Sequence, residues 1–228
     1  MVSRRLRRAA VAVLCTVALS GCASAHPGAA AQVGDVSISD QSLEQSASGF
    51  CELIDTINQA QQGTQTPVPL RTALLSALNT LVMGEALDQL AAQNDVEVTD
   101  AEIDQWISGL PLDFTGVPES RTDDVAAVTQ RVARNSLLME KLGQVAYAEQ
   151  NPGSGSAPAN QVQQLGQQMV NAYMQRVGVE TDPRYGQVLD TQKVPGTGSL
   201  SIPVSQEGVE GQTVPEASNT LAQNEECA

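Results

Sequence analysis

Apolar residues recur along most of the chain at the three- and four-residue spacing of amphipathic helices. This spacing predicts helices over 40–61, 69–94 and 121–149. A last helix is predicted over 161–177, after a turn at 151–160 that is rich in glycine, proline and asparagine. The fold class is therefore expected to be mainly α with a few short strands, around a core of leucine, valine, isoleucine and alanine.

A further short helix has its own start signal. Thr99 and Glu102 have the spacing of a capping box, in which each side chain satisfies a backbone N–H group of the first turn. The motif predicts a helix from Asp100 to about Leu110, followed by a loop over 111–118.

Strands occupy little of the predicted fold. Residues 33–39 (VGDVSIS) alternate between apolar and polar, which predicts one short strand, and short strand-like pieces follow Gly178. From Ser205 the chain becomes polar with scattered proline and glycine, as is typical of a mobile tail. We expect one domain over 33–204 and a tail over 205–228.

The start of the chain has the pattern of an export signal. Arginines at positions 4, 5, 7 and 8 precede an apolar run over 9–19, which is short of the roughly 20 residues that span a bilayer. The next motif, Leu19-Ser20-Gly21-Cys22, resembles the bacterial lipobox, whose cysteine sulfur receives a diacylglyceryl group before cleavage leaves it as the first residue.

The lipobox resemblance implies a signal peptide over 1–21 and a lipid anchor on Cys22. Residues 22–32 are small and are expected to form a flexible tether. The protein is then expected on the extracytoplasmic face of the cell membrane, held by two acyl chains. The alternative is an ordinary signal peptide that is cut near residues 23–25.

The cysteine count predicts one disulfide. Cys15 leaves with the signal peptide and Cys22 carries lipid, so Cys51 and Cys227 remain as a pair in an oxidising compartment. We predict a bridge between them; the alternative is two free thiols.

Composition excludes several classes of function. The formal net charge is −14, and without the four leader arginines it is 8 − 26 = −18, so net charge gives no attraction to nucleic acid. Aromatic residues are 3% of the chain, too few for a base-stacking platform. The single histidine, His26, excludes Ser-His-Asp triads, Cys-His dyads and multi-histidine metal sites. We expect no enzyme activity, catalytic residue, metal or cofactor.

The acidic clusters are interpreted as solvated charges. Asp123-Asp124 and Glu225-Glu226 are adjacent pairs, and neighbouring helix positions point in different directions. Asp100, Glu102 and Asp104 lack the glycine turn and distal glutamate of a calcium loop, and first-turn acids suit the helix dipole.

Three motifs in order resemble one known family. The strand at 33–39 lies behind a lipobox, long helices follow, and Val98-Thr99-Asp100-Ala101-Glu102-Ile103-Asp104 starts a short helix. This order resembles the N-terminal domain of SurA-type and PrsA-type exported chaperones. Residues 177–186 resemble the end of that family's closing helix, so the resemblance covers about 33–202. Many relatives insert a parvulin-type prolyl isomerase domain where this chain has only 151–160, so that domain is expected to be absent.

The resemblance implies a non-catalytic chaperone that binds unfolded or extended exported polypeptides. If the apolar helix faces exceed what the core can cover, the uncovered faces would form a groove. The candidate residues that line it are Leu138, Leu142, Met169 and Tyr173. The methionines in the predicted helices fill either such a groove or the core. The alternative function is an accessory envelope lipoprotein that docks one specific protein partner. Arg184 and Tyr185 are interpreted as a structural corner, with Arg184 paired to an acid of the helical layer.

Overall fold

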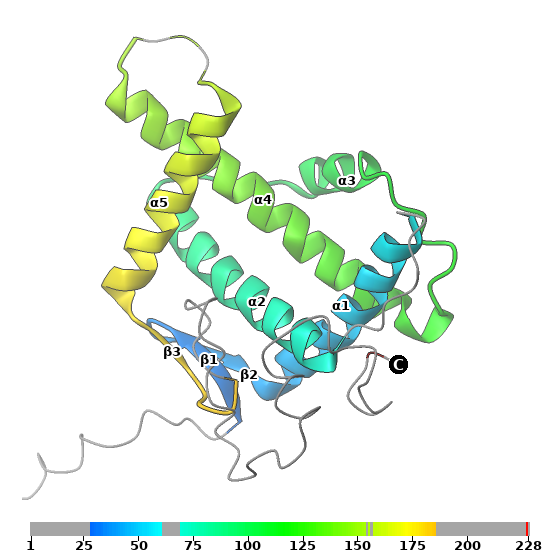
Figure 1. Cartoon of the computed structure of the whole chain (residues 1–228). Coiled ribbons are helices and arrows are strands. Elements are labelled where there is room, and N and C mark those ends of the chain that lie inside the picture. Colours follow the sequence, from blue (N-terminus) through cyan, green and yellow to red (C-terminus); the bar gives the residue numbers. More distant parts are fainter. Residues whose placement is uncertain (1–27, 61–68, 154, 156, 186–226, 228) are drawn as a thin grey trace, which may run out of the picture.

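The protein, seen here in a computed structural model, is a helical domain with a small sheet at one side (Figure 1). The structure describes residues 28–60, 69–153, 155, 157–185 and 227. Within these residues it has five α-helices, a short 3-10 helix at Glu119–Arg121 and a three-stranded sheet. The predicted fold class is confirmed.

The chain enters the domain through a β-hairpin. Strand β1 (Ala29–Val33) turns at Gly34 and Asp35 into β2 (Val36–Ser39), with Gly34 at a φ of 58° in the left-handed region. The prediction of a single strand over 33–39 is therefore wrong, because the alternation continues through a Gly-Asp turn. Strand β3 (Val179–Thr181) pairs antiparallel with the other side of β1, which gives the order β2-β1-β3.

The predicted flexible tether ends earlier than residue 32. Residues 29–32 belong to β1, where Ala30 and Ala31 are buried and the amide of Gln89 donates to the backbone oxygen of Val33. Small alanines, which suggest flexibility in sequence, here fit a strand beneath the helices. Residues 22–27 lie outside the described part of the chain, as do the predicted signal peptide and Cys22.

Helices α1 (Asp40–Ala60) and α2 (Leu70–Gln93) follow the predicted apolar stripes. Pro69 lies at the N-cap of α2, where its missing N–H costs nothing. Asn94 closes the other end of α2, because its side-chain amide donates to the oxygen of Leu90. The boundaries taken from the hydrophobic pattern are accurate to a few residues.

Helix α3 (Asp100–Ser108) begins with the predicted capping box. The backbone N–H of Glu102 donates to the Thr99 hydroxyl at 3.3 Å, and the backbone N–H of Thr99 donates to the Glu102 carboxylate at 2.9 Å. Glu102 also pairs with Lys141 of α4 (Thr122–Gln150) at 2.7 Å, so one side chain both starts α3 and docks it.

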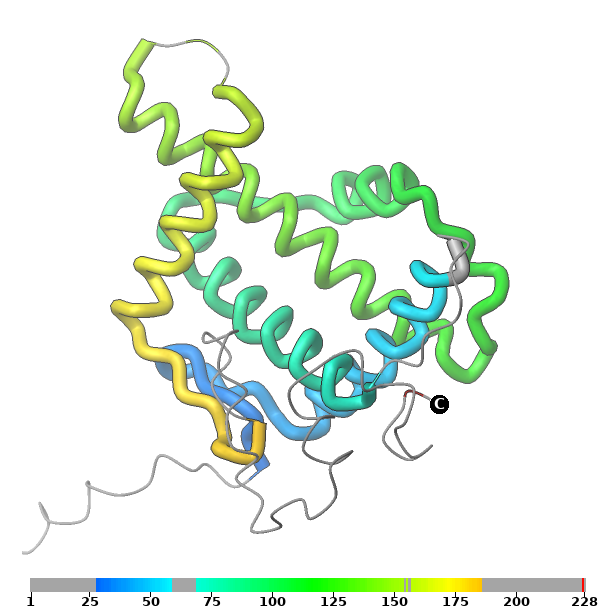
Figure 2. Tube along the Cα trace, viewed as in Figure 1, coloured from blue at the N-terminus to red at the C-terminus, as the bar shows by residue number. Residues whose placement is uncertain are grey.

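Helix α4 and helix α5 (Ala159–Val177) form an arm that extends beyond the rest of the domain (Figure 1). Residues 151–158 connect the two helices, so no further domain is inserted between them. The traces of α4 and α5 cross and then separate toward this connection (Figure 2). At the crossing, a Cβ added to Gly143 would overlap the carbonyl oxygen of Val162, and one added to Gly166 would overlap that of Met139.

One apolar core joins the sheet and all five helices. Its largest fully buried side chains are mostly leucine and valine: Leu43, Leu78, Leu87, Leu138, Leu142, Met174, Val33, Val82 and Val170. Within the described residues, Val36 is the one large apolar side chain classed as exposed. None of the described helices combines the length and the hydrophobicity needed to cross a membrane.

The C-terminal end returns to the domain through a disulfide. Cys51 of α1 is bonded to Cys227, the pair that the cysteine count predicts, across a sequence separation of 176 residues. Cys51 is 6% exposed and belongs to the core. Residues 186–226 lie outside the described part of the chain, so the boundary predicted at residue 205 stays a prediction.

Candidate functional site

The four residues predicted to line a groove lie mainly in the core. Leu138 and Leu142 of α4 are 1% and 0% exposed, and Tyr173 of α5 is 4% exposed. Met169 is half-buried and packs against the same core. A groove lined by these residues is therefore a wrong prediction.

Two glycines explain why no groove opens there. Because Gly143 and Gly166 have no side chains, the backbones of α4 and α5 approach each other closely at the crossing. This contact removes the space between the two apolar stripes. The apolar helix faces that were expected to stay uncovered are therefore covered by direct contact between α4 and α5.

Tyr173 has a structural role that its sequence position does not reveal. Its hydroxyl donates to the side-chain oxygen of Gln89 at 2.7 Å and accepts from the amide of Gln93 at 3.2 Å. Gln89 in turn donates to Val33 of β1. Tyr173 therefore links α5, α2 and the sheet, and is not free to contact a ligand.

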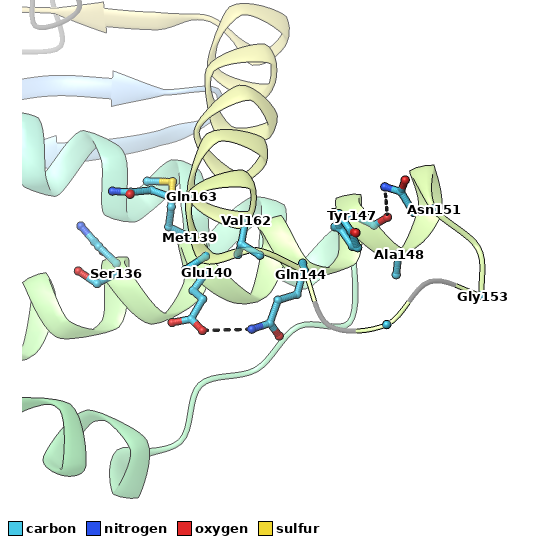
Figure 3. A pocket seen from close by; sticks show the side chains of 14 residues that line it. Ser136, Met139, Glu140, Gln144, Tyr147, Ala148, Asn151, Gly153, Val162 and Gln163 are labelled. Atoms are coloured by element: carbon cyan, nitrogen blue, oxygen red, sulfur yellow. Dashed lines mark hydrogen bonds between the residues drawn. The ribbon is translucent and has the colours of Figure 1, made fainter.

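A pocket does exist on the arm, beside the crossing and along the part of α4 and α5 that leads to their connection (Figure 3). Its volume is about 830 Å³, within the range of pockets that hold small molecules. The second half of α4, from Asn135 onward, the connecting turn and the start of α5 line it. The lining residues that carry its chemistry are Ser136, Met139, Glu140, Gln144, Tyr147, Ala148, Asn151, Val162 and Gln163.

The α4 side of this pocket is a polar stripe. Glu140, Gln144, Tyr147 and Asn151 follow one another at helical spacing and share one face. The Gln144 amide donates to the Glu140 carboxylate at 3.1 Å, and the Asn151 amide donates to the backbone oxygen of Tyr147 at 3.1 Å (Figure 3). These bonds hold the polar groups in place at the pocket wall.

The opposite helix offers carboxamides in place of charges. Arg176 is the one charged residue of α5, and its polar surface otherwise consists mainly of amides: Asn160, Gln161, Gln163, Gln164, Gln167, Gln168, Asn171 and Gln175. Only Gln163 of these lines the pocket, while the others continue the same character along the helix. This composition is visible in the sequence, but it resembles an ordinary polar helix face until the pocket beside it is known.

The acidic clusters of the sequence are placed in structural roles. Asp124 accepts a hydrogen bond from Ser48 at 3.1 Å, while Asp123 is exposed. The pKa of Glu102 is lowered to about 2, first by its bond to Lys141 and then by its bonds to Thr99. Over the described ranges, no three or more His, Cys, Asp or Glu residues are grouped so that they could hold a metal ion. Glu225 and Glu226 lie outside those ranges.

Arg184 and Tyr185 form the predicted corner between the sheet and the helices. The Arg184 guanidinium lies 2.9 Å from Asp40, the first residue of α1, and 3.0 Å from Asp182. The Tyr185 hydroxyl donates to Asp40 at 3.1 Å. The corner fastens the end of the described domain to the start of α1.

Comparison with known proteins places this fold in a family. No curated protein and no solved structure matches the chain. The family model described as "SurA-like N-terminal domain" matches residues 8–141, more than half of the chain. The match covers the hairpin through most of α4 and stops before the connection of the arm. The chain belongs to the SurA-like N-terminal domain family, a chaperone-type family whose domain is non-catalytic.

Proposed function

We propose that the protein is a membrane-anchored, extracytoplasmic chaperone-like lipoprotein that binds unfolded exported polypeptides in the pocket of the α4–α5 arm. The family supports polypeptide clients as the class of ligand. The export signal over 1–21 and the lipobox at Cys22 support the location and the anchor. Binding of this kind requires no cofactor.

The observation that carries the proposal is the mixed lining of the pocket. Met139, Val162, Ala148 and the ring of Tyr147 offer apolar surface, and a methionine adapts its shape to different side chains. Gln144, Gln163 and Asn151 offer carboxamides, each with both donor and acceptor atoms. An extended polypeptide presents the same mixture, with backbone N–H and C=O groups between its side chains.

The position of the pocket also favours client binding. Its outer part lies on the portion of the α4–α5 arm that extends beyond the rest of the domain (Figure 1). Backbone recognition through amides depends little on sequence. We therefore expect a range of clients and not one fixed partner.

The test fills the pocket with a side chain. Ala148 lines the pocket and is exposed, so Ala148→Trp should occupy the space without disturbing the core. We expect it to lower the affinity for fluorescein-labelled unstructured peptides by about tenfold, measured by anisotropy. It should also abolish any suppression of the aggregation of a reduced, unfolding client. The matched control is Ala126→Trp, at an exposed position of the same helix away from the pocket.

Equal affinities of the two variants would contradict the pocket as the site. Indifference of the wild-type protein to the aggregating client at several-fold excess would contradict the chaperone function. If only one peptide of an unrelated set binds, the result would favour the alternative function, in which the protein docks one specific envelope partner.

A further inference from the structure

The distribution of charge along the arm is unusually one-sided. From residue 142 to residue 175 the sequence contains no lysine, arginine or histidine. Lys141, at the border of this stretch, is engaged elsewhere, because its ammonium lies 2.7 Å from Glu102 and also donates to the backbone oxygen of Glu97. The pocket is therefore lined without a cation.

Glu140 is the charged residue of the pocket wall. Its side chain receives a hydrogen bond from Gln144, and within the described chain it has no ion pair. Charge effects from the rest of the acidic surface are screened beyond about 8 Å at physiological salt. A ligand in the pocket therefore meets one uncompensated negative charge within a neutral, amide-rich site.

Glu140 and Tyr147 define two ends of the wall. They are seven residues apart on one face of α4, which corresponds to about 10 Å along the helix axis. An extended polypeptide covers that distance in about three residues. The half-buried ring of Tyr147 suits an apolar side chain at one end, and the Glu140 carboxylate suits a cation at the other.

We propose that the pocket selects extended segments that carry a lysine or arginine about three residues from an apolar side chain. This inference rests on the proposed function and names the class of client that the same site prefers. Acidic segments are disfavoured, because Glu140 has no ion pair within the described chain and the adjacent Lys141 is paired with Glu102. The protein would thus recognise the basic, apolar stretches of exported chains.

The experiment compares three labelled peptides in anisotropy titrations with the purified protein. They are identical and unstructured, with a leucine and, three residues away, a lysine, a glutamine or a glutamate. We expect the lysine peptide to bind about threefold more tightly than the glutamine peptide, and the glutamate peptide to bind most weakly. The preference should shrink at 0.5 M salt because a partly exposed charge is screened.

Two variants locate the charge. Glu140→Gln should remove the preference, so that the lysine and glutamine peptides bind this variant with equal affinity. Glu149→Gln is the matched control, since Glu149 is an exposed glutamate of the same helix outside the pocket. It removes the same net charge and should keep the preference.

Each remaining outcome decides between the two proposals. Equal binding of all three peptides would overturn the selection for cations and leave the polypeptide pocket standing. A preference that persists in Glu140→Gln, or that falls equally in Glu149→Gln, would assign it to the general field of an acidic protein and overturn the role of Glu140. Absence of binding by all three peptides would overturn the proposed function itself.

Discussion

The two ends of this domain are held by different chemistry. At the end that contains the sheet and α1, Arg184 bridges Asp40 and Asp182, and a disulfide joins Cys51 to the C-terminal end of the chain. At the other end, the α4–α5 arm is held by backbone contact at two glycines, and the polar surface of α5 consists mainly of neutral amides. The first end is fastened by charges and a covalent bond, whereas the second leaves its polar groups available.

This difference separates stability from binding. At the corner, the charged groups are already paired with one another, and the two cysteines are bonded. These groups are therefore engaged in holding the fold and are not available to a ligand. The amides of α5 are neutral and lie at the helix surface, where Gln167 donates to Asn171 at 3.0 Å. We therefore expect changes at the corner and the disulfide to alter folding, and changes at the end of the arm to alter binding.

The largest effect is expected from loss of the disulfide. Cys227→Ser removes a cross-link over 176 residues, which should lower the free energy of unfolding by about 3–4 kcal/mol, less than the roughly 5 kcal/mol of the loop-entropy model. Urea denaturation followed by circular dichroism measures it. Reductant should destabilise the wild-type protein by the same amount and leave the variant unchanged. Peptide affinity should stay constant in the folded variant, and its loss would contradict the separation of the two ends.

A smaller loss is expected at the crossing of the arm. Gly143→Ala places a methyl group against the backbone oxygen of Val162, which cannot move without shifting α5. Alanine favours a helix by about 1 kcal/mol over glycine, so the strain must exceed that gain. We expect a net destabilisation of about 2 kcal/mol in the same denaturation experiment.

Gly116→Ala is the matched control for the crossing. A methyl group at Gly116 meets no atom within 4 Å, and its stability should change by less than about 0.5 kcal/mol. A Gly143→Ala variant as stable as the control would show that α4 and α5 are not in backbone contact. The groove predicted from the apolar stripes would then regain its space.

The parts of the fold that sequence predicted are those with local signals. The capping box at Thr99 and Glu102 and the apolar spacing of the long helices depend on residues within a few positions of one another. These features needed no knowledge of tertiary contacts.

The parts that sequence missed depend on how separate segments meet. Gly143 and Gly166 are ordinary helix glycines until the two helices cross, and only then do they show why Leu138 and Leu142 are buried. The alanines at positions 30 and 31 are interpreted from the sequence as part of a tether, because their burial depends on helices that are distant in the sequence. The pocket depends on how α4 and α5 are placed relative to each other, and the spacing of apolar residues along the sequence does not predict that placement.

The smallest effect is the response of the corner to pH. The side chain and the backbone N–H of Arg184 hold the pKa of Asp182 below its ordinary value of 3.8. A lowered pKa contributes stability above pH 3.8 that is lost as the pH falls through the folded-state value. Burial, and then the bond to Asp40, raise the pKa of Tyr185 above 10.0, so its contribution is present below pH 10 and is lost as the pH rises further.

The corner should therefore lose stability at both extremes of pH. Plotted against pH, the free energy of unfolding then falls along an acid limb and an alkaline limb, and one variant tests each limb. Asp182→Asn should flatten part of the acid limb of the unfolding free energy, while Tyr185→Phe should flatten part of the alkaline limb and leave the acid limb intact. Glu102, whose pKa is about 2, accounts for another part of the acid limb and serves as an internal reference through Glu102→Gln. Because the amides of α5 do not titrate, their substitution should leave both limbs unchanged. If a Gln164→Ala variant changed the pH dependence at either extreme, the contrast between the charged corner and the neutral amides of α5 would fail.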